Sequence, residues 1–191
     1  MEQEIIQYIS EYISLEPDEA RELARAIPFK ACSKGTYLLK EGEISKECYF
    51  VLKGLVRQYE TVDGDEKTTY FYTEKEALVA FESANEQKPN GFSWVCEEDS
   101  VVVVGRFDEM DDFYERHPKM EAFARKFIGQ DFSKYQELLS SFVTLSPKER
   151  YLALLEKRPD LVHRVPQYQL ASFLGIQPET LSRIRRKLAT E

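Results

Sequence analysis

The chain has 191 residues, of which 42% are hydrophobic, and its formal net charge is −8. A chain of this length forms one large domain or two small ones and can bury a substantial core. No apolar run approaches the roughly 20 residues of a membrane-spanning helix, and the acidic first residues exclude a secretory signal, so we expect no membrane partner.

The cysteines indicate the compartment. Cys32, Cys48 and Cys96 are odd in number and widely spaced, which fits neither a disulfide framework nor a zinc site. A reduced, cytoplasmic setting fits better, and we expect the three thiols to be small core residues. We predict a cytoplasmic protein with no metal site and no cofactor.

The first predicted elements are a helical region and then a β-rich one. Residues from about 1 to 26 are predicted to be helical, with Ile5, Ile9 and Leu23 among the inward positions, and Pro28 ends this region. From 29 to 107, short runs rich in β-branched and aromatic residues alternate with turn signals, as is typical of an antiparallel roll. The candidate strands are YLLKEG, CYFVLKGLVRQYETV, KTTYFYT, EALVAFE, FSWVCEE and SVVVVGRF, with a hairpin turn at Asp63-Gly64.

From about Asp108 the pattern becomes helical again. A short helix is predicted before His117-Pro118, and a longer one over about 119–141, roughly 35 Å at 1.5 Å per residue. The longer helix carries more aromatic residues than one side of a small roll needs, and we interpret the excess as a subunit interface. The alternative is a helix that packs only on its own domain. Ser146-Pro147-Lys148-Glu149 predicts the capped start of another helix, 147–157, and a domain boundary.

The stretch QYQLASFLGIQPETLSRIRR, residues 167–186, predicts a helix-turn-helix. Its first helix covers about 167–174, and Gly175 can take the left-handed conformation that a tight turn needs. Pro178 suits the first position of the second helix, where Leu181, Ile184 and Leu188 form an apolar stripe. The opposite face carries Glu179, Ser182, Arg183 and Arg186. A helix that reads DNA needs this division, although an amphipathic helical hairpin with a solvated basic face would show it too.

The charge is segregated along the chain. Residues 146–190 hold nine Lys or Arg and four Asp or Glu, a net charge of +5, whereas residues 1–145 have a net charge of −12. A basic C-terminal segment suits contact with phosphate, while the acidic remainder would be repelled from it. The acidic pair Glu97-Glu98 is expected to be solvated surface.

This order of elements resembles the CRP/FNR family of bacterial transcription regulators. The most specific matches are KGTYLLKEGE at 34–43, YFVLKGLVRQY at 49–59 and PETLSRIRRKL at 178–188. The resemblance implies an α+β fold with a jelly-roll-like β-roll that senses a small molecule, a long helix that forms a parallel dimer seam, and terminal helices that read a two-fold symmetric DNA site. The family's recognition pattern falls on Glu179, Ser182 and Arg183, whereas Pro178 stands where many members have an Arg.

Departures from the family concern the sensor. Members that bind cyclic AMP hold its phosphate with an Arg before Ser or Thr, after a Gly-Glu pair whose Glu takes the ribose hydroxyl. The corresponding stretch here is 78–95, where Phe92 precedes Ser93 and Lys88 is the only cation. Burying a cyclic phosphate without a charged partner is costly, so we expect no cyclic AMP binding, and Glu82 is more simply a structural or surface carboxylate.

Other ligands remain open for the roll. The candidate lining residues for an unidentified small-molecule effector are Glu82, Phe92, Ser93, Tyr49 and Phe71. The alternative, which we favour, is a filled core packed by Tyr49, Phe71, Phe81 and Trp94. The cysteines are not clustered as an iron–sulfur sensor requires, and neither His117 nor His163 suits a haem ligand in the roll. The sequence ends three residues past Leu188, where relatives usually continue into a β-hairpin wing, so we expect a lower DNA affinity.

We therefore predict a homodimeric transcription regulator that binds double-stranded DNA, with RNA polymerase as a further partner. Its predicted parts are a sensor domain at 1–117, a dimerisation helix and hinge at 118–145, and a DNA-binding domain at 146–191. Arg183 would donate to guanine and Glu179 would accept from cytosine, while Ser182 would contact a base or a phosphate. The predicted phosphate anchors are Thr180, Gln169, Arg185, Arg186 and Lys187.

Two other functional classes are alternatives. A ligand-binding signalling module whose helices contact a protein partner would keep the roll and the long helix but would not need segregated basic charge. An enzyme is excluded by the residue inventory, because neither His lies inside the roll and there is no nucleophile–base spacing, phosphate loop or metal set.

Overall fold

A computed structural model describes residues 2–190, with every side chain in that range except that of Gln130. Met1 and Glu191, the outer ends of the first and last predicted domains, lie outside the described residues. The chain divides into two compact units, one formed by Met1–Gln58 with Phe71–Phe132 and the other by Tyr59–Tyr70 with Ser133–Glu191.

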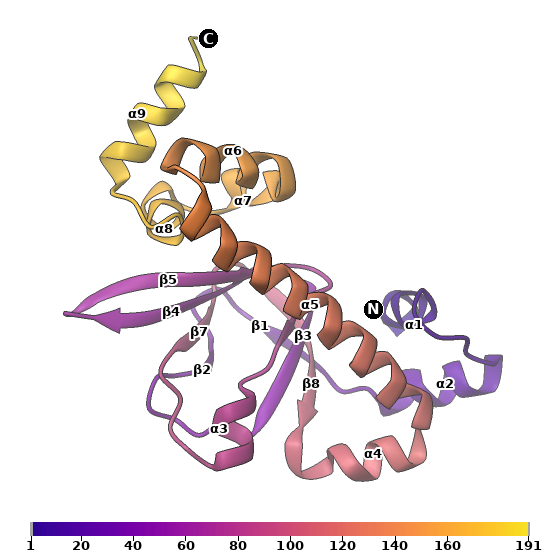
Figure 1. Ribbon diagram of the computed structural model, residues 1–191. Coiled ribbons are helices and arrows are strands. Elements are labelled where there is room, and N and C mark those ends of the chain that lie inside the picture. Colours follow the sequence, from indigo (N-terminus) through magenta and orange to yellow (C-terminus); the bar gives the residue numbers. More distant parts are fainter. Residues whose placement is uncertain (1, 191) are drawn as a thin grey trace. The chain divides into compact units, whose positions relative to one another are not determined.

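The first unit begins with two helices, α1 (Glu2–Ser10) and α2 (Pro17–Ala26) (Figure 1). The predicted helical region over about 1–26 is therefore interrupted before Pro17. Glu16 is extended, with φ −72° and ψ 154°, and caps α2, whose first position is Pro17. The residue before a proline is biased away from the helical region, which explains the break. Glu16 and Glu19 complete a capping box at the start of α2.

The strands form two four-stranded sheets, with the orders β1-β8-β3-β6 and β2-β7-β4-β5. The strands are β1 (Phe29–Cys32), β2 (Tyr37–Leu39), β3 (Glu47–Lys53), β4 (Val56–Val62), β5 (Asp65–Tyr72), β6 (Ala77–Leu78), β7 (Ser93–Cys96) and β8 (Ser100–Arg106). In the first sheet β3 pairs antiparallel with β8, placing Val51 opposite Val102, both fully buried. The predicted α+β fold with an antiparallel roll is confirmed.

Local differences from the predicted strands have identifiable causes. The segment EALVAFE supplies only the two-residue β6, and Phe81–Glu86 forms a short helix, α3, because good helix formers follow Val79. The predicted hairpin is present between β4 and β5, where Asp63 and Gly64 both have positive φ, 54° and 86°. Positive φ at both central residues is what a tight two-residue hairpin turn requires.

A core outside the sheets joins the N-terminal helices to the first part of α5 (Pro118–Thr144). Its buried members are Ile5, Tyr8, Ile9, Leu23, Ile27, Phe123 and Phe127. The rings of Phe123 and Phe127 stack with centroids 5.8 Å apart, and Tyr8 meets each of them edge-on at 6.3 Å. Figure 1 shows α1 and α2 beside this part of α5. Phe123 and Phe127, two aromatic residues of the long helix, thus pack within their own unit and do not belong to the excess that predicts a subunit interface.

The remaining helices are η1 (Phe107–Glu109), α4 (Met110–Arg116), α6 (Pro147–Lys157), α7 (Pro159–Arg164), α8 (Gln167–Phe173) and α9 (Pro178–Leu188). The capping box of α6 is present, since the Ser146 N–H donates to Glu149 over 2.8 Å. Hydrogen bonds from Ser146 lower the pKa of the Glu149 carboxyl. No helix between residues 2 and 190 is long and apolar enough to cross a membrane. Helix α7 was not predicted.

Candidate nucleic-acid interface

The turn between α8 and α9 depends on a glycine. Gly175 has φ +66°, a conformation that residues with a Cβ rarely adopt. Its N–H donates to the Ser172 carbonyl over 2.9 Å, and the Ile176 N–H donates to the Ala171 carbonyl over 3.0 Å. These bonds satisfy carbonyl groups that the end of α8 would leave unpaired, so the turn is fixed by the backbone itself.

The two helices are held together by small and apolar residues. Ala171 on α8 and Leu181 on α9 are both fully buried, and Leu170 is 1% exposed. Each buried leucine contributes roughly 1.5–3 kcal/mol relative to an exposed one. Of the predicted apolar stripe of the second helix, Leu181 points inward and Ile184 and Leu188 are half-buried, so the opposite face of α9 is directed to solvent.

The start of α9 is also set locally. Gln177 is extended, with φ −76° and ψ 148°, and Pro178 occupies the first helical position, as predicted. The Thr180 N–H donates to the Gln177 carbonyl over 3.0 Å and begins the helical pattern.

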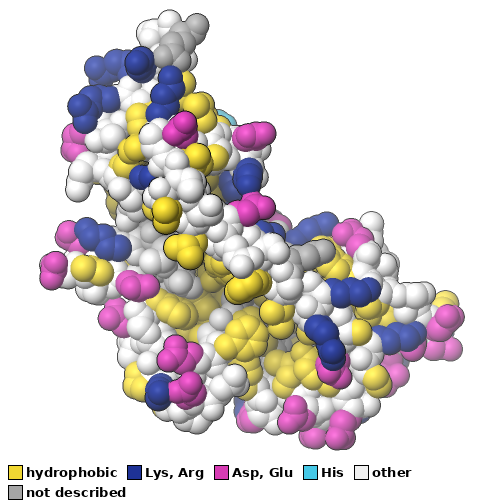
Figure 2. All heavy atoms as spheres, in the orientation of Figure 1, with side chains coloured by type: hydrophobic (Ala, Val, Ile, Leu, Met, Phe, Trp, Pro, Cys, Tyr) yellow, Lys and Arg dark blue, Asp and Glu magenta, His cyan; other side chains and the backbone are white. Residues whose placement is uncertain are grey.

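The outward face of α9 carries most of the predicted DNA contacts. Its exposed residues are Glu179, Arg183, Arg185, Arg186 and Lys187, and Thr180 and Ser182 are half-buried. Figure 2 shows the Lys and Arg side chains gathered over this helix. An Nη2 of Arg183 donates to Oγ1 of Thr180 over 3.2 Å. This hydrogen bond restricts the guanidinium before any partner arrives, which reduces the entropy lost on binding.

Gln169 does not join this face. Its side chain is 3% exposed, on the inward side of α8 beside Leu170 and Phe173. This burial argues against the predicted role of Gln169 as a phosphate anchor. The neighbouring Tyr168 is 62% exposed and was missed, although the helical period of α8 places it outward.

Helix α5 carries a stripe of exposed apolar residues, in which Tyr135 also contacts Tyr70 and Phe142 also contacts Arg150. Five of its exposed apolar residues follow a four-three spacing along the helix: Ile128, Phe132, Tyr135, Leu139 and Phe142. Leu139 is 69% exposed and Phe132 61% exposed. Figure 2 shows hydrophobic side chains along the course of α5. An alternating spacing of this kind is the pattern of a coiled-coil seam.

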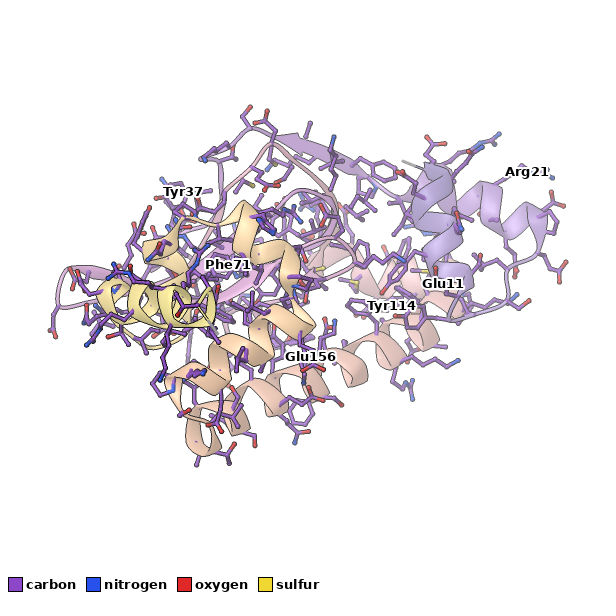
Figure 3. The ribbon with its side chains drawn as sticks, turned by 90° about the horizontal axis from the view of Figure 1, so that it is seen from above. Glu11, Arg21, Tyr37, Phe71, Tyr114 and Glu156 are labelled. Carbon is purple, nitrogen blue, oxygen red and sulfur yellow. The ribbon has the colours of Figure 1, made fainter. Side chains whose placement is uncertain are left out.

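The interior of the roll is packed with aromatic rings. Trp94 and Phe71, the latter labelled in Figure 3, are completely buried, and Tyr49 is 5% exposed. The rings of Tyr49 and Trp94 meet edge-on at 6.2 Å. Oε1 of Gln58 accepts hydrogen bonds from Trp94 Nε1 over 2.8 Å and from the Tyr72 hydroxyl over 3.0 Å. Gln58 thereby satisfies the polar ends of two buried aromatic side chains.

The other residues predicted to line a ligand pocket either make contacts within the protein or are exposed. Ser93 is buried, and its Oγ accepts from the Glu41 N–H over 3.0 Å. The ring of Phe92 lies 5.3 Å from that of Trp94, and Glu82 is exposed on α3. Phe81, which we expected in the filled core, is 46% exposed, so that prediction is wrong. The helix that replaces the predicted strand at this point turns Phe81 outward.

A buried ion pair in the first unit was not predicted. Nε of Arg57 donates to Oε1 of Glu97 over 2.5 Å, and the two side chains are 7% and 12% exposed. The expectation that Glu97 is solvated surface is therefore wrong. A buried guanidinium requires a nearby carboxylate. The charge of Arg57, which lies outside residues 78–95, is therefore balanced by Glu97.

The cysteines are core residues, as expected. Cys32 and Cys96 are buried and Cys48 is half-buried, all as free thiols. Burial raises the pKa of the Cys96 thiol to about 11 and that of the Cys48 thiol to about 11. Among the described residues, no group of His, Cys, Asp and Glu side chains is placed to hold a metal ion.

Comparison with known proteins agrees with this architecture. The cyclic nucleotide-binding domain family matches residues 29–117, which include all eight strands. The chain is 24% identical over 170 residues to the fumarate and nitrate reduction regulatory protein of Yersinia pestis, covering 81% of this chain and 66% of that protein. The chain thus spans about two thirds of the length of this relative.

Solved structures share the fold at low sequence identity. A CooA variant from Carboxydothermus hydrogenoformans superposes with a TM-score of 0.72 at 13% identity, covering 97% of this chain and 84% of that one. The Thermus thermophilus catabolite activator protein gives a TM-score of 0.56 at 19% identity, covering 94% and 86%. The fold is therefore that of a cyclic nucleotide-binding-type roll followed by a long helix and a helix-turn-helix. In sequence and in fold, the chain is similar to these bacterial regulators.

Proposed function

We propose that this protein is a sequence-specific DNA-binding transcription regulator that acts as a homodimer on a two-fold symmetric site. The observation that carries the proposal is the outward face of α9, where exposed Glu179, Arg183 and Arg186 stand at helical spacing opposite the buried Leu181. The major groove admits such a helix, and its base edges require donors and acceptors.

Each residue of this face has a distinct proposed role. Arg183 donates to guanine O6 and N7, Glu179 accepts from cytosine N4, and Ser182 contacts a base or a phosphate. Phosphates are bound by Thr180, Arg185, Arg186 and Lys187, contacts that position the protein and carry no sequence information. Gln169 is left out of this set because it is buried.

The dimer is proposed from the exposed stripe on α5. A parallel pair of these helices would cover Phe132, Tyr135 and Leu139 of both chains. A two-fold axis along the seam would place two α9 helices about 34 Å apart, one turn of DNA. The relative from Yersinia pestis is by name a regulatory protein, which supports the same class of function.

The remaining proposals concern domains, partners and effector. Residues 1–117 would act as the sensor domain, 118–145 as the dimerisation helix and hinge, and 146–191 as the DNA-binding domain. RNA polymerase would be a further partner, in the cytoplasm. We propose that the roll does not use cyclic AMP, because Arg57 is paired with Glu97 and the aromatic rings of Tyr49, Phe71 and Trp94 fill the interior.

Selection of bound duplexes from a random pool tests this function. The full chain at a stated salt concentration should enrich duplexes that contain a two-fold symmetric sequence, with half-sites about 10 base pairs apart. Enrichment of no sequence over many rounds, with affinity set by salt alone, would instead favour a signalling module that acts through protein contacts. The variant Arg183→Ala should enrich a more degenerate pool, and Lys157→Gln, an exposed charge change on α6, should enrich the same site as the wild type.

A further inference from the structure

Arg150 bridges two helix ends in the second unit. It lies one turn into α6, and its Nη1 donates to the Leu145 carbonyl over 2.8 Å. Its Nε donates to the Leu174 carbonyl over 3.1 Å. Leu145 directly follows the end of α5, and Leu174 caps the C-terminal end of α8. One guanidinium therefore joins the end of the long helix to the turn that precedes α9.

These two carbonyls suit a cation. The last carbonyls of a helix have no partner within it, and the C-terminal end carries a partial negative charge. A guanidinium presents several donors in a fixed plane, whereas an ammonium is a compact charge on a flexible stem and cannot hold the same pair of directions. Leu145 and Leu174 are thus held at a fixed separation by a rigid group.

Phe142 completes the junction. The Arg150 guanidinium lies 5.2 Å from the centroid of its ring, a cation–π distance. On the other side, a Cβ added at Gly175 would stand 3.1 Å from Cε1 of Phe142, so the turn approaches the ring closely. The turn between α8 and α9, the end of α5 and the first turn of α6 all meet at this ring.

We infer that Arg150 is a positioning residue that fixes the direction of α9 relative to the end of α5, and so sets the half-site spacing that the dimer accepts. The inference rests on the proposed function. Two α9 helices can reach two half-sites only if each keeps its angle to the dimer seam. A substitution of Arg150 should therefore weaken the preference for one half-site spacing and leave the residues that face the bases unchanged.

A purely structural role predicts a different outcome. If Arg150 only stabilised α6 or the turn, its loss would lower the thermal stability and would weaken every DNA complex by a similar factor. A positioning role instead changes one ratio, the affinity for the correctly spaced site over the affinity for a site with altered spacing. Binding to a duplex with a single half-site should hardly change.

The experiment measures that ratio for the full-length chain at one salt concentration. The duplexes are the selected two-fold site, the same site with one base pair added or removed at its centre, and a single half-site. The variants are Arg150→Lys and Arg150→Gln, and Lys157→Gln is the charge-matched control on the same helix, since Lys157 pairs with Glu137 in solvent. Circular dichroism checks that each variant is folded.

The wild type and Lys157→Gln should prefer the native spacing by roughly tenfold or more, the size of one misplaced specific contact. Both Arg150 variants should reduce this preference to about threefold or less, with half-site affinity within about threefold of the wild type. An unchanged spacing preference in either variant, a uniform loss on all three duplexes, or a failure of both variants to fold would overturn the inference. Failure of the wild type to bind any duplex specifically would contradict the proposed function instead.

Discussion

The backbone N–H of Thr68 donates to Oγ of Ser172 over 2.9 Å, although 104 positions separate the two residues. Thr68 lies on β5 and Ser172 on α8, within the same compact unit. Beside this bond, the ring of Tyr70 packs 6.4 Å from that of Phe173 and 4.9 Å from that of Tyr135. The β4–β5 hairpin is therefore joined to the first helix of the helix-turn-helix, α8, by one polar and one aromatic contact, and to α5 by a second aromatic contact.

Replacing Ser172 with Ala should loosen this attachment. Thr68 is 5% exposed, so its N–H would lose a partner where water has little access. Such a loss costs about 1–3 kcal/mol of stability. Hydrogen exchange at the Thr68 amide should accelerate, and the second unit should unfold at lower urea concentration. Ser140→Ala, at an exposed position of α5, should leave both quantities as in the wild type; equal exchange rates at Thr68 in all three proteins would show that this bond contributes nothing.

A charge on the α5 stripe should separate the dimer. Leu139→Asp would place a carboxylate at a residue that is 69% exposed in the single chain and covered in the proposed dimer. Burying it should weaken dimerisation by at least about thirtyfold. Light scattering at micromolar concentration should give twice the chain mass for the wild type and the single mass for the variant. Gln136→Asp adds the same charge beside the stripe and should remain dimeric. A monomeric wild-type protein would contradict the proposed dimer through α5.

Cyclic nucleotides should not bind the roll. The polar atoms of Ser93 and Gln58 are already engaged within the protein, and Trp94 and Phe71 occupy the interior. Calorimetric titration with cyclic AMP and with cyclic GMP should therefore give only heats of dilution. Binding at micromolar concentration would show that backbone N–H groups or Lys88 can replace the missing guanidinium, and it would contradict the filled core.

Stability should fall at alkaline pH because of the buried thiols. Burial raises the pKa of Cys96 to about 11 in the folded chain, against about 8.5 for an exposed thiol. The folded state therefore holds this proton more tightly than the unfolded state. The contribution of the protonated Cys96 thiol to the free energy of unfolding is complete below pH 8.5 and is lost as the pH rises towards 11. Between pH 8 and 10.5, the free energy of unfolding measured with urea should decline less for Cys96→Ala than for the wild type. Ser33→Ala, a change at an exposed position, should decline as the wild type does. An equal decline in all three proteins would contradict the raised pKa of Cys96.

The C-terminal helices could be predicted from the sequence because each boundary has a local cause. Gly175, Pro178 and the Ser146 capping box act through their own backbone conformations, so the helix starts and the turn follow from residue type. The alternation of the β-rich runs likewise predicts an antiparallel roll. These features depend on the local sequence alone and not on contacts with distant segments of the chain.

The errors arise where a distant segment decides the outcome. Glu97 was expected at the surface because nothing near it in sequence shows that Arg57 lies against it. The bridge from Arg150 to Leu145 and Leu174 could not be predicted either, since it depends on how α6 packs against two other helix ends. Gln169 is a different case, because the helical period of α8 already places it on the buried side, beside Leu170 and Phe173.

The central claim is that α9 reads DNA sequence, and one titration tests it most directly. Wild-type protein and Arg183→Ala are titrated against the selected two-fold site and against a scrambled duplex of the same composition, at one fixed salt concentration. The wild type should bind the selected site at least about a thousandfold more tightly, and the variant should lose roughly tenfold to a hundredfold of that ratio, the value of a good base contact. Equal affinity of the wild type for both duplexes, or an undiminished ratio in the variant, would contradict the claim.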